Sequence, residues 1–244
     1  MPSFLAALLA ISLIGAAVAQ VPSTQPVNSP QPSEILRRAA EALRKPSLLR
    51  YHVEFTTSEK ELLAIRGYVL LTTGPTETGS RKYSFDGTIA RPPAAVRDVK
   101  IVADGKMFTL LDEQAKTVHR AAQPQVLGPI GRELPRLLLP DVLSAPTSQP
   151  TTAPAPTLVG TTSLGGEECY EIRSVLSPQR TLIRFISTKD YLPRRIQHID
   201  AAAPASDDNW TLTLSEFSLD PAFFVDPFKL DIPEGYRASS ETAP

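Results

Sequence analysis

The sequence predicts a mainly β protein of the α+β class: a strongly curved antiparallel sheet, or incomplete barrel, with a few helices over one face. Three observations lead to this prediction. Segments of alternating apolar and polar residues follow one another along the chain. Turn residues such as Asp104-Gly105 separate them, which is typical of an antiparallel meander. So many strands favour strong curling, because a flat sheet would leave long exposed edges.

The N-terminus predicts export. The first residues form an uninterrupted apolar run that ends in Ala17-Val18-Ala19, the small-x-small pattern of a signal-peptide cleavage site. Residues 1–19 are therefore predicted to be a signal peptide, and the protein to be periplasmic. The run lacks Lys and Arg at its start, so an uncleaved membrane anchor stays open as an alternative. Residues 20–32, rich in Pro, Ser and Gln, predict a disordered tether.

A short amphipathic helix is expected directly after this tether. Ser33 would cap it, Lys45 suits its last turn, and Pro46 would stop it. Apolar residues three and four positions apart form one face: Ile35, Leu36, Ala39 and Leu43.

Strands are then predicted wherever apolar and polar residues alternate. These segments are 51–59, 62–73, 81–87, 98–103, 107–112, 166–177, 180–187, 194–200 and 209–219. An apolar insert at 128–144 interrupts them, and Pro135 and Pro140 limit it to short helical turns. Residues 145–157 form a Pro/Thr-rich tract, interpreted as an inserted loop. One domain at 33–237 and a tail at 238–244 are expected.

Composition and motifs argue against several functions. The formal net charge of −1 gives no electrostatic footprint for nucleic acid. The single cysteine, Cys169, cannot form an intramolecular disulfide and is interpreted as a small buried apolar residue. The three histidines lie far apart, and neither an HExxH nor a GxSxG motif occurs. We therefore expect no metal, no cofactor and no catalytic residues: the protein is predicted not to be an enzyme.

Apolar strand surface remains as the feature that could carry a function. The alternating residues either fill a core against the helices or line a cavity for an apolar ligand, and periodicity does not separate the two. The candidate ligand-binding residues on strands are Val53, Phe55, Val69, Leu71, Tyr83, Phe85, Phe108 and Leu110. The candidate lid residues are Leu134, Leu137 and Leu138.

Three motifs, in order, carry a resemblance to a known family. They are Asp104-Gly105-Lys106 with the two strands that follow, the second ending in Thr117-Val118, then Tyr191 to Ile196 (YLPRRI), and Phe228 to Tyr236 (FKLDIPEGY). The last resembles a C-terminal strand that ends in Pro-x-Gly. Together they resemble the periplasmic lipoprotein carriers of the LolA/LolB type, over roughly residues 33–237. The resemblance implies an incomplete barrel with a helical lid, and an apolar cavity that holds acyl chains of lipoproteins during transport.

The sequence also departs from that family. The carriers latch their lid with an arginine near the end of the second long strand, where this chain has Leu71-Thr72-Thr73-Gly74-Pro75. Arg81 or Lys82 is a candidate substitute. The central hairpin has Met107, Phe108 and Leu110 where the carriers are rich in Trp and Tyr. These departures favour a general binder of lipids over a true lipoprotein shuttle.

The predicted function is thus an exported, non-enzymatic binder of an apolar ligand: the acyl chain of a lipid or lipoprotein. Peripheral contact with a membrane is compatible with this role. The alternative is an envelope-sensing or protein-interaction domain on the same scaffold, with an envelope protein as its partner and an uncleaved N-terminus as its tether.

Overall fold

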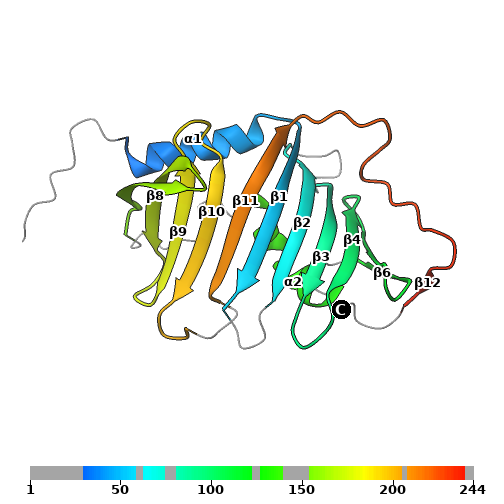
Figure 1. Cartoon of the computed structure of the whole chain (residues 1–244). Helices are drawn as coiled ribbons and strands as arrows, with labels where there is room; N and C mark the ends of the chain where they lie inside the picture. Colours follow the sequence, from blue (N-terminus) through cyan, green and yellow to red (C-terminus); the bar gives the residue numbers. More distant parts are fainter. Residues whose placement is uncertain are drawn as a thin grey trace, which may run out of the picture.

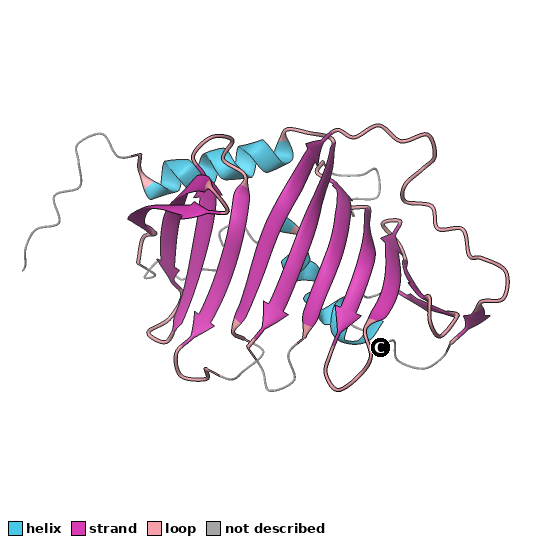
Figure 2. Cartoon of the chain, viewed as in Figure 1, coloured by secondary structure: helices cyan, strands magenta, loops and turns pink. Residues whose placement is uncertain are grey.

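The computed structural model describes residues 30–58, 63–74, 81–122, 127–139, 154–204 and 208–239. In this part of the chain, one wide curved sheet forms the body of the molecule, with one helix across its upper end and a second behind it (Figures 1 and 2). The predicted curved antiparallel sheet with helices on one face is confirmed. The predicted signal peptide, most of the tether, residues 145–153 of the insert and residues 240–244 lie outside the described residues.

The helices are α1 (Pro32–Arg44) and α2 (Gly128–Leu137). The strands of the first half are β1 (Leu48–Thr57), β2 (Ala64–Thr72), β3 (Tyr83–Ala90), β4 (Arg97–Ala103), β5 (Phe108–Asp112) and β6 (Thr117–Ala121). Those of the second half are β7 (Thr157–Leu164), β8 (Glu167–Val175), β9 (Arg180–Ser187), β10 (Pro193–Asp200), β11 (Trp210–Leu219) and β12 (Arg237–Ala238).

Two meanders make up the sheet. Among the described residues its order is β12-β6-β5-β4-β3-β2-β1-β11-β10-β9-β8-β7. Each meander pairs consecutive strands, and the antiparallel pair of β1 with β11 joins the two. The residues after the insert therefore continue the same sheet, as predicted. The short β12 runs parallel to β6 and covers that edge, with Arg237 opposite Thr117.

Cross-strand register fixes which side chains face the concave side. Directly paired residues lie on the same face of a sheet. One such row is buried throughout: Tyr51, Val69, Phe85, Ile101 and Leu110. It packs with the buried face of α1 (Ile35, Ala39, Leu43) and with α2 in a single core cluster. The amphipathic pattern of the predicted helix thus serves the core.

A pair of glycines lets the sheet bend between β2 and β3. Gly67 lies directly opposite Gly87. A Cβ atom added at Gly67 would lie 2.4 Å from the carbonyl oxygen of Asp86, and one added at Gly87 would lie 2.2 Å from that of Arg66. The backbones thus approach more closely than side chains allow, which is a recognised way to curve a sheet.

Two details of the predicted helices need correction. Helix α1 begins at Pro32 with Gln31 as its N-cap residue, so Ser33 lies inside the helix and does not cap it. The reason is that proline suits the first helical position, where its missing N–H costs nothing. Helix α2 runs through Pro135 for ten residues instead of breaking into short turns. Proline there removes one internal hydrogen bond but does not end the helix.

Three predictions about strands and turns also need correction. The Asp104–Gly105 hairpin is a longer loop, in which the Asp104 carboxylate accepts hydrogen bonds from the backbone N–H groups of Lys106 and Met107. Gly105 still has the expected positive φ, 94°. The Phe228–Tyr236 motif contains no strand, and Ala238, assigned to the tail, belongs to β12.

Candidate functional site: the concave face of the sheet

The predicted ligand-binding residues all lie in or against one core cluster. Of the eleven, nine are buried, and Phe108 and Leu138 are partly buried against the same cluster. The sequence therefore grouped side chains that do come together beneath the helices. That they contact a ligand stays a prediction, because in this structure they contact one another.

A tyrosine fastens α2 to the sheet. The hydroxyl of Tyr51 in β1 donates a hydrogen bond of 2.7 Å to the carbonyl oxygen of Leu137 and accepts one of 3.4 Å from the backbone N–H of Leu139. Tyr51 thus satisfies backbone groups at the C-terminal end of the helix, which need a partner when buried. Of the two candidate latch residues, Lys82 lines a pocket on the opposite face, so it does not serve as the latch.

Helix α1 is held at its outer surface as well as by its core face. Arg38 donates a hydrogen bond of 2.9 Å to the hydroxyl of Tyr191, in the turn between β9 and β10. Glu34 accepts hydrogen bonds from Arg37 and Arg38, which hold the pKa of its exposed carboxyl at about 2. The helix N-terminus also favours a negative charge at Glu34. Helix α1 therefore has well-paired charges along its exposed side.

One end of the concave face carries a buried carboxylate with partners. Asp112, at the end of β5, is 1% exposed. Its carboxylate accepts hydrogen bonds from the backbone N–H groups of Gln114 and Ala115, and Arg97 lies 3.0 Å away. A buried charge with such compensation is typical of a structural turn.

The other half of the face contains a buried arginine that the sequence analysis missed. Arg184 in β9 is 4% exposed. It is directly opposite Ile172 in β8 and Ile196 in β10, both buried in the core cluster, so its side chain lies on the concave face. The signal was present as the one charge within the apolar run LIRFI, residues 182–186.

A hollow of about 480 Å³ lies near the β7–β8 and β9–β10 turns, and its lining includes a cluster of paired charges around Arg194. Arg194 donates two hydrogen bonds to Glu167, of 2.7 and 2.8 Å, and a third to Asp190. The Arg194 bonds hold the pKa of Glu167 below its usual range. Nearby Cys169 is fully buried, as predicted, and burial raises the pKa of its thiol. This cluster is a structural tie and offers no activated nucleophile.

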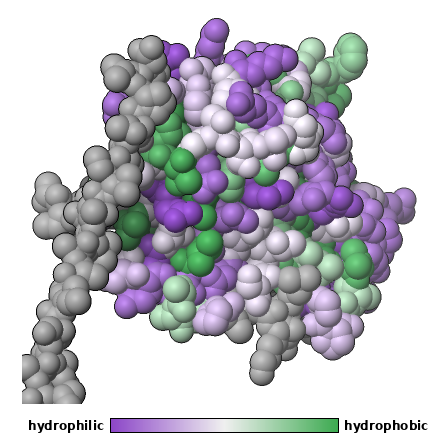
Figure 3. Space-filling view, turned by 60° about the vertical axis from the view of Figure 1, so that its left-hand side comes forward, coloured by the Kyte–Doolittle hydropathy of each residue, from purple (hydrophilic) through white to green (hydrophobic). Residues whose placement is uncertain are grey.

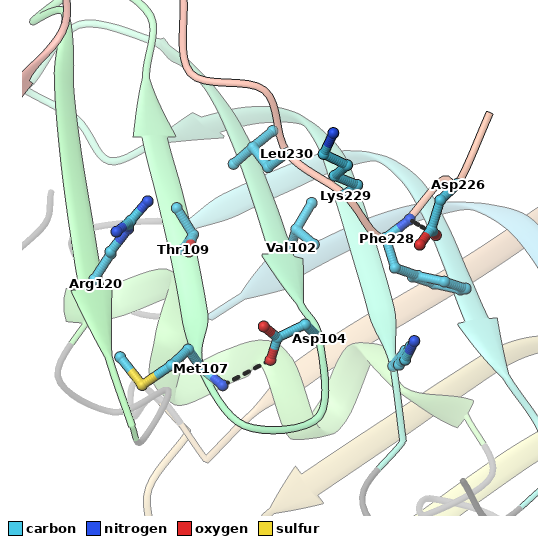
Figure 4. Close-up of a pocket in the computed structure, with 10 residues that line it drawn as sticks. Val102, Asp104, Met107, Thr109, Arg120, Asp226, Phe228, Lys229 and Leu230 are labelled. Carbon is cyan, nitrogen blue, oxygen red and sulfur yellow. Dashed lines mark hydrogen bonds between the residues drawn. The ribbon is translucent and has the colours of Figure 1, made fainter. Parts of the chain in front are cut away.

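A second hollow, of about 510 Å³, lies on the convex face (Figure 4). It forms where the chain after β11 crosses the sheet and Phe228 packs on Leu70 and Val102. Charged residues dominate its rim: Lys82, Asp104, Arg120, Asp226 and Lys229. A groove with such a charged rim does not suit an acyl chain.

Within the described ranges, no group of three His, Cys, Asp or Glu side chains has the geometry to hold a metal ion. Neither of the helices described is long and apolar enough to cross a membrane. Seen from the β8 side, the surface shows hydrophobic residues in separate patches between hydrophilic ones (Figure 3).

Sequence comparison identifies the family. Residues 86–238 match the family described as predicted periplasmic protein (DUF2092). The chain belongs to this family. Its periplasmic location, predicted from the N-terminus, is thereby confirmed. No curated protein matches the chain in sequence.

Solved structures of similar fold share little sequence with this member of the family. LprF from Mycobacterium bovis has 15% identity and a TM-score of 0.49, with 82% of this chain and 99% of LprF covered. MucB in complex with MucA(peri) has 12% identity and a TM-score of 0.42, covering 79% of this chain and 57% of MucB. A LolA superfamily protein from Nitrosomonas europaea has 14% identity and a TM-score of 0.31, covering 80% and 96%.

Proposed function

We propose that this periplasmic protein is a non-enzymatic carrier that binds an acyl chain between the concave face of its sheet and helix α2. The observation that supports this most is the continuity of the apolar surface across both meanders. Buried apolar residues line the face from Leu110 in β5 to Ile172 in β8, across the junction of β1 with β11. An open sheet with such a face needs a cover, and an acyl chain can share that task with α2.

Helix α2 has the properties of a displaceable cover. In the described residues no side chain caps its N-terminus, its first turn has no acidic residue, and Pro135 interrupts its hydrogen bonding. Each of these features weakens a helix. Apolar contacts of Ile130, Leu134 and Leu137 hold it on the sheet. The Tyr51 hydrogen bonds and the guanidinium of Arg136, which lies over the ring of Trp210, hold it further. An acyl chain would take over the apolar contacts as the helix shifts.

The expected affinity suits a carrier. Burial of a hydrocarbon chain contributes about 0.8 kcal/mol per CH₂, and a single chain gives marginal, reversible binding. Part of that gain offsets the loss of contacts between α2 and the sheet. Cargo bound in this way can be released, which a transport protein requires.

Native mass spectrometry with a neutral probe tests the proposal. The mature chain is purified from an envelope fraction, delipidated, and titrated with dodecanol. We expect one bound dodecanol per chain, and tighter binding in Leu134→Ala, because that truncation opens space beside the proposed chain. The matched control Leu70→Ala removes the same atoms from the convex cluster and should leave dodecanol binding unchanged. No uptake by the wild type or by Leu134→Ala would overturn the proposal.

One observation favours a second candidate, a protein-interaction or membrane-contact role. Phe223, Phe224 and Val225 form an exposed apolar run shortly after β11. Exposed runs of this kind often mark contact surfaces. Replacing all three by Ser tests it: this role predicts loss of envelope association with unchanged dodecanol binding, whereas the carrier proposal predicts that both persist.

A further inference from the structure

Arg184 differs from its surroundings on the concave face. Its cross-strand neighbours are Ile172 and Ile196, and Leu182 and Ile186 flank it on the same face of β9. All four are buried members of the core cluster. A guanidinium ion therefore lies within the apolar surface where the acyl chain is proposed to bind.

The hydrogen bonds of this guanidinium are incomplete. An Nη1 N–H donates to the hydroxyl of Ser174 at 3.0 Å, while the Nε N–H has no partner. Within the described ranges no carboxylate pairs with Arg184, in contrast to Arg180 and Arg194 on the same meander. A guanidinium has five donors in a planar fork, so most of its capacity for an anion is unused.

Burial of such a charge works against folding. Transfer of an unpaired ion out of water carries a large desolvation cost, and here burial lowers the pKa of Arg184 to about 10. Arg184 is still protonated at neutral pH. Neutral Ser174 cannot compensate the charge, so the fold alone gives no reason for an arginine at this position.

We infer that Arg184 binds the anionic headgroup of the ligand, so that the cargo is an acidic amphiphile carrying a carboxylate or phosphate group. The inference rests on the proposed function, because it places the chain of the same ligand along the concave face. The fork of Arg184 matches both anions, and the Ser174 hydroxyl holds one side of the fork in place. The chain then runs toward β1, three strands or about 14 Å away.

A series of probes with one chain and different headgroups tests this inference. Delipidated mature protein is titrated by calorimetry with dodecanoate, dodecyl phosphate, dodecanol and dodecylamine at pH 7.4, below their aggregation limits. We expect one or both anions to bind about tenfold to hundredfold more tightly than dodecanol, as hydrogen bonds to a charged group allow. Dodecylamine should bind most weakly. The ratio of the two anions distinguishes a carboxylate from a phosphate headgroup.

Three variants separate headgroup binding from a structural role. Arg184→Met should lose the preference, so that it binds the anions and dodecanol about equally. Arg184→Lys should keep a reduced preference for anions, because it keeps the charge without the fork. Arg195→Met is the matched control: its Nε N–H also lacks a partner, but Arg195 pairs with Phe185 on the convex side. Its preference should equal that of the wild type.

The outcomes distinguish this inference from the proposed function. Equal binding of anions and dodecanol by the wild type would overturn the role of Arg184 and leave the carrier proposal standing. Binding of none of the probes would overturn both. An anion preference that persists in Arg184→Met would also contradict the inference, because the headgroup would then bind elsewhere.

Discussion

The two meanders of the sheet form one apolar concave face, but their buried charges differ in how they are paired. In the first meander, buried Asp112 has Arg97 and two backbone N–H groups as partners. In the second, Arg184 is buried with one neutral hydroxyl partner and no acid in the described chain. The first arrangement stabilises a turn. The second costs stability, so its explanation must come from what the protein binds.

The glycine pair gives the largest expected effect and tests whether curvature is built into the first meander. Gly67→Val should reduce the free energy of unfolding by about 3 kcal/mol or more, because its Cβ would overlap the carbonyl oxygen of Asp86. Urea unfolding followed by circular dichroism measures this. The control is Gly74→Ala, where nothing lies within 4 Å of the added Cβ and the change should stay within about 0.5 kcal/mol. Equal effects of both substitutions would show that close approach at Gly67 does not matter.

The second largest effect is expected at Asp112, the buried carboxylate of the first meander. Asp112→Asn should lower the free energy of unfolding by about 2 kcal/mol, because Arg97 loses its partner and the turn N–H groups lose a charged acceptor. Glu171→Gln, which removes a half-buried carboxylate of the second meander with a longer 3.5 Å contact to Arg173, is the comparison. If Asp112→Asn lowers the free energy of unfolding no more than Glu171→Gln does, the paired charge does not stabilise the first meander. The contrast between the two meanders would then fail.

The charge of the second meander should behave in the opposite way. Arg184→Met is expected to leave stability unchanged or to raise it by about 1 kcal/mol, because an unpaired buried ion is replaced by a side chain of similar length. The same urea titration, on delipidated protein, provides the measurement. A loss of 2 kcal/mol or more would mean that Arg184 has a structural partner, and the two meanders would then be alike.

Acid should weaken the cluster of Arg194, Glu167 and Asp190 near the β7–β8 turn. This is the smallest of the expected effects on stability. The Arg194 hydrogen bonds lower the pKa of Glu167 in the folded state. For Asp190, burial acts in the upward direction, but the bonds from Arg194 and Leu192 outweigh it. A depressed carboxyl pKa contributes stability that is present above the unfolded-state value near 4 and is lost as pH falls through the folded value. The difference between the unfolding midpoints at pH 7 and pH 3.5 should therefore be smaller in Arg194→Met than in the wild type. An unchanged pH dependence in that variant would rule out this cluster as its source.

The sequence allowed the fold to be predicted wherever the hydrophobic period was clear. Alternation placed Tyr51, Val53 and Phe55 on the core side of β1, and the three- and four-residue spacing placed Ile35, Ala39 and Leu43 on the core side of α1. Each pattern depends on local geometry alone. Such patterns also brought the candidate ligand-binding residues together correctly.

What the sequence could not give depends on register and long-range packing. Leu182 and Ile186 are buried on one face of β9, and Ile183 and Phe185 on the other, so alternation does not reveal which face Arg184 occupies. The Gly67–Gly87 pair likewise requires the β2–β3 register. The Phe228 segment packs on the convex face through contacts with Leu70 and Val102, distant in sequence. No local pattern predicts such contacts.

A crystal structure of the delipidated mature protein with 12-bromododecanoate would locate both ends of the ligand on the sheet, since bromine is located by its anomalous scattering. We expect the carboxylate on the guanidinium of Arg184, and the bromine on the concave face near Phe55 in β1, which lies in the same cross-strand row as Arg184. Bromine in the convex groove beside Phe228, or a carboxylate away from Arg184 with the chain elsewhere, would contradict this expectation.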